Sequence, residues 1–264
     1  MPYRVDLRNV GSDALDRLID LGAIDAESSH DGGLAALMPD SVAPEKIASA
    51  LSAGEMSVSA AEGRDADSVW LLSPRPIQIG RVRIVPSDRE AQADAITLID
   101  ARAFGTGRHP TTALCLEALD ELLQIDSPGA VLDVGTGSGV LALAALKMGV
   151  PRALGIDIDE DALRVAAANA RINDMEERLQ LALCGPESVT GTWSLVLANV
   201  LAAPLIEMAP ALVRRVGHQG RLVLSGIPSS AEQDVDAAYR RLGMRRMRVT
   251  SNGGWVALVL TASW

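Results

Sequence analysis

The stretch VLDVGTGSGVLALAALKMG, residues 131–149, decides the fold of this chain. A short apolar strand ends at Asp133, and three glycines, Gly135, Gly137 and Gly139, alternate through a turn that leads directly into a helix. Glycine is needed in such a turn because the ligand lies against the backbone and the helix approaches the strand closely. The pattern therefore predicts the site at which a doubly wound sheet binds a nucleoside cofactor.

The spacing of the glycines favours one kind of cofactor. A dinucleotide site places its third glycine five positions after the first, and here that position is Val140. The next strand, RALGIDID at 152–159, ends at Asp157, where a carboxylate can accept hydrogen bonds from both hydroxyls of a ribose. An N-cap role for Asp157 is the alternative, but Asp159 already fills it. NAD, or a sensor fold without chemistry, remain the competing interpretations.

Apolar strands alternate with helices through the rest of the C-terminal part, which predicts a parallel sheet buried on both faces. The strands are expected at 130–135, 152–158, 179–183, 193–199 and 220–226, and the helices at 109–123, 138–149, 160–173 and 203–216. The final segment, 245–264, has two strands around Asn252-Gly253-Gly254, which predicts an antiparallel hairpin at the sheet edge. The expected fold class is α/β, with a doubly wound, mostly parallel seven-stranded Rossmann-like sheet.

Residues 1–60 have a different pattern, with strands at 3–7, 23–28, 33–39 and 56–61 and helices at 13–22 and 43–52. The order βαββαβ predicts a small N-terminal ferredoxin-like α+β domain. The segment 76–88 predicts a hairpin that turns at Gly80. We therefore expect a ferredoxin-like substrate-recognition domain at 1–62, a linker and hairpin at 63–95, and a catalytic domain at 96–264.

The charge and composition of the chain indicate which classes of binding partner are expected. The net charge is −10, and ten acidic against four basic residues place −6 of it in the first sixty residues. A negative net charge disfavours binding to the phosphate backbone of a nucleic acid and favours a basic partner. Alternatively, the acidic residues of the first sixty only form a solvated surface. We expect no membrane segment, no metal site and no disulfide framework in a cytoplasmic protein with two packing cysteines, Cys115 and Cys184. The oligomeric state is left open.

Five motifs, in this order, resemble those of the bacterial ribosomal protein L11 methyltransferase (PrmA) family, a group of class I enzymes that use S-adenosylmethionine (AdoMet). They are AFGTGRHPTT at 103–112, DVGTGSGVLALAALKMG at 133–149, GIDIDEDAL at 155–163, NVLAAPL at 199–205 and LSGI at 224–227. The resemblance implies transfer of methyl groups to amino groups, a lysine side chain or the N-terminal amine, of a basic ribosomal protein. It also implies that the first loop closes over the cofactor and the second forms the floor beneath it.

The resemblance carries site residues over to this chain. It places cofactor contacts on Thr112, Gly135, Asp157 and Asn199. Asn199 also ends an apolar strand at the sheet edge where substrates bind, so we expect its side-chain oxygen to orient the attacking amine and Asn199 to be the catalytic residue. The full set of residues expected to contact AdoMet is Phe104, Thr106, Thr112, Asp133, Gly135, Gly137, Gly139, Asp157 and Asn199.

Each of these residues also has a plainer interpretation. Thr111 or Thr112 could only cap the following helix, and Asn199 could be a helix N-cap or a turn residue. His109 could be a loop histidine held by a backbone carbonyl, and Phe104 a packing anchor.

The chain departs from the family pattern outside the cofactor floor. Asp100-Ala101-Arg102 stands where Pro-Gly-Met is usual, Arg108 replaces the second Thr of GTGTH, and only Trp70 is left of a paired tryptophan pattern. These positions bear on the substrate more than on the cofactor. Competing functions are therefore a methyltransferase for another protein or a small amine, and a non-catalytic AdoMet-binding module.

Overall fold

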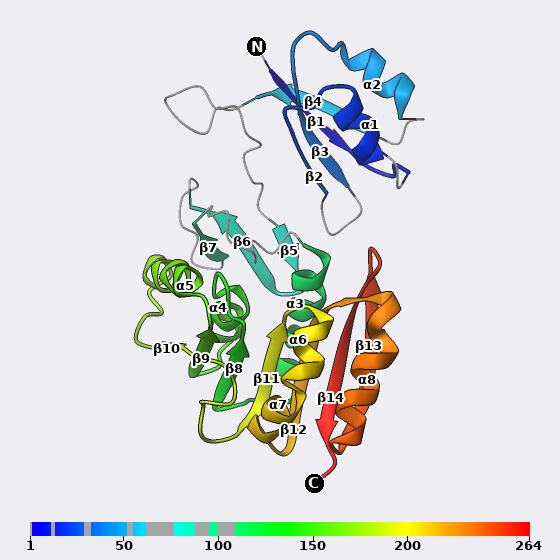
Figure 1. Ribbon diagram of the computed structural model, residues 1–264. Coiled ribbons are helices and arrows are strands. Elements are labelled where there is room, and N and C mark those ends of the chain that lie inside the picture. Colours follow the sequence, from blue (N-terminus) through cyan, green and yellow to red (C-terminus); the bar gives the residue numbers. More distant parts are fainter. Residues whose placement is uncertain are drawn as a thin grey trace. The chain divides into compact units, whose positions relative to one another are not determined.

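The computed structural model describes residues 2–11, 14–28, 33–51, 55–61, 77–87, 95–99 and 109–264 (Figure 1). The chain divides into two compact units, Met1–Arg75 and Pro76–Trp264. The elements of the first unit are β1 (Tyr3–Leu7), α1 (Ala14–Asp20), β2 (Asp25–Ser28), β3 (Leu34–Met38), α2 (Pro44–Ala50) and β4 (Met56–Ala60).

The first unit is a four-stranded antiparallel sheet in the order β2-β3-β1-β4. Alternate residues of β1 and β3, among them Val5, Leu7 and Ala36, join Leu18 of α1 and Ile47 of α2 in a buried core. The predicted order βαββαβ is therefore present.

The second unit begins with a small three-stranded sheet in the order β5-β6-β7, made of β5 (Ile77–Ile79), β6 (Val82–Pro86) and β7 (Ala95–Leu98). β5 and β6 form the predicted antiparallel hairpin, while β7 runs parallel to β6 and was not predicted. The run AITL of β7 is too short to show a periodicity, although all four of its residues are buried. The expected domain boundary at residue 62 lies outside the described residues and stays a prediction.

The main sheet has seven strands in the order β10-β9-β8-β11-β12-β14-β13. They are β8 (Ala130–Val134), β9 (Arg152–Asp157), β10 (Leu179–Leu183), β11 (Trp193–Asn199), β12 (Val216–Pro228), β13 (Met244–Asn252) and β14 (Trp255–Ala262). The strands from β10 to β12 are parallel. β14 inserts antiparallel between β12 and β13, so the predicted mostly parallel sheet with an antiparallel edge hairpin is confirmed.

Helices cover both faces of this sheet (Figure 1). They are α3 (Pro110–Ile125), α4 (Val140–Lys147), α5 (Glu160–Ile172), α6 (Ala202–Glu207), α7 (Ala209–Arg215), the short 3-10 helix η1 (Ser229–Ala231) and α8 (Glu232–Arg241). Alternate strand residues divide between two cores: Val131 and Leu197 pack with α3 and α4, whereas Leu132 and Val196 pack with α6, α7 and α8. This alternation explains why the strands read as continuous apolar runs. Among the described residues, no helix has both the length and the apolarity needed to cross a bilayer.

Two helix predictions differ from the structure. The single helix expected at 203–216 is two helices that meet at Met208, because Pro210 in the first turn of α7 has no N–H to donate back to the preceding turn. The second difference is α8, which was not predicted. Its residue Tyr239 is fully buried and donates a hydrogen bond to the Leu205 carbonyl oxygen (2.8 Å). Its sequence is strongly polar, which hid the narrow buried stripe.

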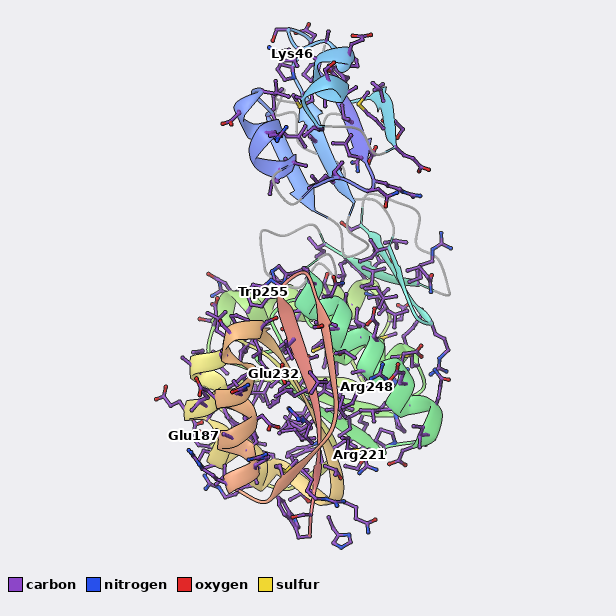
Figure 2. All side chains as sticks on the ribbon, turned by 90° about the vertical axis from the view of Figure 1, so that its right-hand side faces the viewer. Lys46, Glu187, Arg221, Glu232, Arg248 and Trp255 are labelled. Atoms are coloured by element: carbon purple, nitrogen blue, oxygen red, sulfur yellow. The ribbon has the colours of Figure 1, made fainter. Side chains whose placement is uncertain are left out.

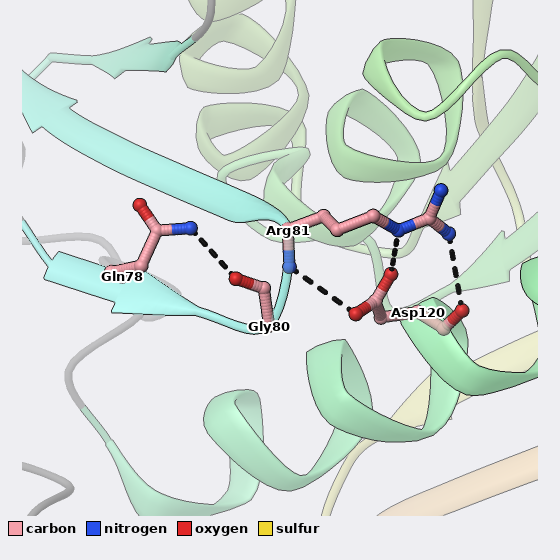
Figure 3. Close-up of polar contacts among 4 residues, drawn as sticks. All are labelled: Gln78, Gly80, Arg81 and Asp120. Carbon is pink, nitrogen blue, oxygen red and sulfur yellow. Dashed lines mark hydrogen bonds and ion pairs between the residues drawn. The ribbon is translucent and has the colours of Figure 1, made fainter.

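The hairpin of the small sheet is fastened to α3 by a carboxylate (Figure 3). Asp120 accepts a hydrogen bond from the backbone N–H of Arg81 (3.2 Å) and another from its Nε, while an Arg81 terminal nitrogen donates to the Asp120 carbonyl oxygen (3.3 Å). The Asp120 side chain is 9% exposed and that of Arg81 is 52% exposed. On the strand side, Gln78 donates to the Gly80 carbonyl oxygen (2.7 Å). The predicted turn at Gly80 is thereby held against the helix that leads into the site.

We expect Arg81→Ala to lower the free energy of unfolding by about 1–2 kcal/mol, because the buried carboxylate of Asp120 loses the Nε donor and keeps only the backbone N–H of residue 81, while water screens part of the interaction. Urea denaturation measures this change. Arg152→Ala, which removes an exposed arginine from β9, is the control and should change the free energy of unfolding by less than about 0.5 kcal/mol. Equal effects of the two substitutions would show that the contact between Arg81 and Asp120 does not contribute measurably to the free energy of unfolding.

Candidate functional site

The site residues gather at the carboxyl ends of the central parallel strands. β8 lies between β9 and β11, and the chain leaves β8 through the glycine turn. The strand order reverses here, since β9 and β10 lie on one side of β8 while β11 and β12 lie on the other. In doubly wound sheets the crevice at such a reversal is where ligands bind.

The glycine turn is pressed against its neighbours. The backbone N–H groups of Gly135 and Thr136 donate to the carbonyl oxygen of Ile156 in β9 (2.9 and 3.0 Å). Gly135 has a φ of 68°, and a Cβ there would lie 2.5 Å from Cγ1 of Val200. A side chain at Gly135 would therefore clash with Val200, which directly follows β11.

The carboxylate of Asp157 is oriented by two backbone N–H groups. Its Oδ2 accepts from Gly137 (2.9 Å) and its Oδ1 accepts from Asp159 (3.0 Å). Asp159 in turn caps α5 by accepting from Asp161, so the predicted N-cap is confirmed. Each oxygen of an ionised carboxylate has two acceptor positions, so Asp157 keeps capacity for a ligand's hydroxyl groups.

Asp133 is fully buried beneath the turn. Its Oδ2 accepts hydrogen bonds from the Thr136 hydroxyl (2.7 Å) and the Ala142 backbone N–H (3.2 Å), while its Oδ1 has no partner. Burial raises the pKa of Asp133 to about 6, and the charge of Asp157 also raises it, against the lowering effect of the two hydrogen bonds. This carboxyl is therefore easier to protonate than an exposed aspartate.

Thr112 and Asn199 meet although 87 positions separate them in the chain. Asn199 ends β11, and its Nδ2 donates to the Thr112 hydroxyl oxygen (3.3 Å), while the Asn199 Oδ1 is buried without a partner. The N-cap of α6 is Leu201, so the alternative role of Asn199 as a helix cap is wrong. A buried acceptor without a partner costs free energy unless a ligand supplies the missing donor.

The cap of α3 is His109, not a threonine. Its extended backbone and its Nδ1, which accepts from the Thr111 backbone N–H (3.4 Å), begin the helix, and Thr111 and Thr112 are fully buried inside the first turn. The His109 ring also packs edge-on against Trp255, with ring centroids 5.0 Å apart. Figure 2 shows Trp255 at the end of β14 where the hairpin turns. Burial lowers the pKa of His109, which favours its neutral, accepting form.

Two apolar side chains at the site were missed by the sequence analysis. Ile158 is 83% exposed directly after Asp157, and Leu183, which pairs with Asp157 across β9 and β10, is 57% exposed. Large exposed aliphatic side chains at the open end of a sheet can contact a flat apolar ligand. The sequence could not show that these two side chains are exposed, because an isoleucine or leucine buried in a strand gives the same apolar pattern.

The predicted contacts Phe104 and Thr106, and the departures at 100–102 and at Arg108, lie outside the described residues. The described part of the site nevertheless fits a nucleoside that carries a cation. It offers a backbone floor at Gly135, an oriented carboxylate at Asp157, and unpartnered buried oxygens on Asp133 and Asn199. No group of His, Cys, Asp and Glu side chains with metal-binding geometry occurs in the part of the chain that the structure describes.

The pH dependence of stability tests the state of Asp133. Because the folded-state pKa of about 6 lies above the ordinary aspartate pKa of 3.8, the contribution of this carboxyl to stability is complete below pH 3.8 and is lost as the pH rises through 6. Relative to Asp133→Asn, the wild type should therefore lose roughly 2–3 kcal/mol between pH 4 and pH 7. The free energy of unfolding of both proteins is measured by urea denaturation at each pH. In the difference between them, the contributions of the other titrating groups cancel. A difference that is independent of pH would contradict the shift.

Comparison with known proteins identifies the relatives of this fold. The family model described as ribosomal protein L11 methyltransferase (PrmA) matches residues 32–263. A curated protein named ribosomal protein L11 methyltransferase from Pelobacter propionicus is 39% identical over 210 residues, which are 76% of this chain and 68% of that protein. One of the same name from Chromohalobacter salexigens is 44% identical over 200 residues, 74% of this chain and 66% of that protein.

A solved structure gives the same result. The crystal structure of a ribosomal protein L11 methylase from Lactobacillus delbrueckii superposes with a TM-score of 0.66 at 28% sequence identity, and the match covers 72% of this chain and 99% of that one. Together with the family model, which spans most of the sequence, these matches establish the family. This chain belongs to the ribosomal protein L11 methyltransferase (PrmA) family.

Proposed function

We propose that this protein transfers methyl groups from AdoMet to amino groups of ribosomal protein L11, a lysine side chain or the N-terminal amine, in the cytoplasm. The relatives at 39% and 44% identity are named for that substrate. The structural observation that carries the proposal is the Asn199 Oδ1, a buried acceptor without a partner at the carboxyl end of β11. It lies where an incoming amine would need a hydrogen-bond acceptor.

The described residues support a specific placement of AdoMet. In the proposal, the ligand lies on the backbone of Gly135, Gly137 and Gly139, and Asp157 accepts hydrogen bonds from the ribose hydroxyls. The exposed side chains of Ile158 and Leu183 supply an apolar surface for the adenine ring. Asp133 supplies negative charge beneath the floor, and Thr112 contributes its hydroxyl group. Phe104 and Thr106 complete the set proposed for the cofactor.

When bound, AdoMet supplies a methyl group activated by a positively charged sulfur. The protein's task is to hold an amine in line with that methyl group, and positioning contributes much of the rate in such a displacement. Asn199 can accept a hydrogen bond from the amine through Oδ1 because its Nδ2 is directed to Thr112. An amide cannot remove a proton, so Asn199 orients the nucleophile and does not act as a base.

A lysine side chain must lose a proton before it attacks. With an ordinary pKa of about 10.4, the deprotonation costs about 4.6 kcal/mol at pH 7. A nearby positive charge and partial burial both favour the neutral amine. The proposal therefore assigns no general base.

We infer that the first unit, whose sheet order β2-β3-β1-β4 supports a ferredoxin-like domain, recognises the substrate. Its excess of acidic residues complements a basic ribosomal protein. The domain limits proposed for this division remain 1–62, 63–95 and 96–264.

Asn199→Ala tests the site. We expect it to lower methyl transfer roughly 100-fold, because the amine loses its alignment, while the AdoMet dissociation constant changes by less than about tenfold. Transfer is measured with labelled AdoMet and purified L11, and AdoMet binding is measured by calorimetry. Unchanged transfer would refute the assignment of Asn199. AdoMet binding by the wild type without transfer to any protein of a bacterial lysate would favour a non-catalytic binding module.

Charge reversal on the first unit tests the proposed recruitment of L11. Glu45→Lys with Glu55→Lys should raise the KM for L11 several-fold at low salt, less at high salt, and leave the AdoMet dissociation constant unchanged. Glu176→Lys with Glu177→Lys makes the same change of charge on exposed positions of the second unit and serves as the control. If both pairs change the KM equally, the first unit has no special role in recruiting L11.

A further inference from the structure

Asn169 of α5 is a fully buried amide that bonds to two backbone segments at once. Its Oδ1 accepts from the backbone N–H of Ile99 (2.8 Å), just after β7, and its Nδ2 donates to the carbonyl oxygen of Ser138 (2.8 Å), inside the glycine turn. Segments 39 positions apart in the chain, at residues 99 and 138, are therefore held by one side chain. Figure 1 shows α5 beside β7.

A second asparagine of the same segment makes a related but different contact. Asn173 accepts from the backbone N–H of Thr97 (2.8 Å) and donates to the Thr97 carbonyl oxygen (2.7 Å). Two residues of an extended chain span about 6.6 Å and four residues of a helix rise about 6 Å, so asparagines at i and i+4 can meet Thr97 in β7 and Ile99 directly after it. In the described sheet β7 is an edge strand, and the two amides supply hydrogen bonds to its backbone and to the residue that follows it.

Of these two asparagines, Asn169 is the one that bonds to the glycine turn. The peptide unit between Ser138 and Gly139 is planar, so the carbonyl that Asn169 holds fixes the Gly139 N–H as well. That N–H donates to the Thr136 carbonyl oxygen (2.8 Å) and closes the turn. Packing supports the same contact, because a Cβ on Gly139 would lie 3.2 Å from Cβ of Ala166, one helical turn before Asn169.

We propose that Asn169 is a positioning residue for the cofactor, which holds the floor of the AdoMet site in its binding shape through the Ser138 carbonyl. The inference rests on the proposed function, in which AdoMet lies on this turn. Without the amide donor, the peptide unit between Ser138 and Gly139 loses one of the hydrogen bonds that hold its plane. Asn173 secures β7 alone and has no such effect on the cofactor.

The experiment compares Asn169→Ala with Asn173→Ala. Both variants lose buried hydrogen bonds to β7, so both should unfold at a lower temperature than the wild type. The AdoMet dissociation constant, measured by calorimetry on the folded full-length protein, should rise at least about tenfold in Asn169→Ala and less than about twofold in Asn173→Ala. A role confined to fastening β7 would change both constants equally, and that result would overturn the proposal.

If Asn169→Ala does not fold, a second pair of variants, Asn169→Asp and Asn173→Asp, still tests the proposal. Asn169→Asp keeps the side-chain volume and the acceptor for the Ile99 N–H, but its carboxylate cannot donate to the Ser138 carbonyl oxygen. Asn173→Asp is its matched control. Weaker AdoMet binding confined to Asn169→Asp supports the proposal, and wild-type affinity in that variant overturns it. If the wild type itself binds no AdoMet, the proposed function fails together with this inference; wild-type binding with unaffected variants overturns the inference alone.

Discussion

The structure depends on the close approach of one backbone turn to its surroundings. Residues 135–139 lie against the Ile156 carbonyl oxygen on one side, the Val200 side chain on another, and Ala166 of α5 on a third. A Cβ on Gly135 would lie 2.5 Å from Cγ1 of Val200, and a Cβ on Gly139 would lie 3.2 Å from Cβ of Ala166, so a side chain at either position would force these neighbours to shift. The absence of side chains thus brings the ends of β8, β9 and β11 together around one small space.

Polar groups buried around this turn divide into two kinds. Those that organise the fold have all their partners within the chain, as the Asn169 amide does. Two residues of the proposed site, Asp133 and Asn199, have an Oδ1 atom without a partner. Arg215 Nε and Asp236 Oδ1, in α7 and α8, are also buried without a partner, so an unpaired atom supports a binding role only together with its place at the carboxyl ends of the strands.

The sequence by itself determined the architecture of the catalytic unit. Its apolar strands alternate with helices, its GxGxG turn lies between a strand and a helix, and Asn252-Gly253-Gly254 marks the final hairpin, so local patterns were sufficient to predict the mostly parallel sheet and its antiparallel edge. The capping role of Asp159 was equally local. Such features depend on neighbours within a few residues, which a single sequence displays.

Only the tertiary structure decided which distant groups meet. The cap of α3 is His109, because burial of Thr111 and Thr112 against the sheet directs their side chains inward, and sequence cannot show burial of a threonine. The pairing of Thr112 with Asn199 and the bridge from Asn169 to Ser138 connect segments that no local pattern relates. The raised pKa of Asp133 likewise follows from burial, which packing creates and composition does not encode.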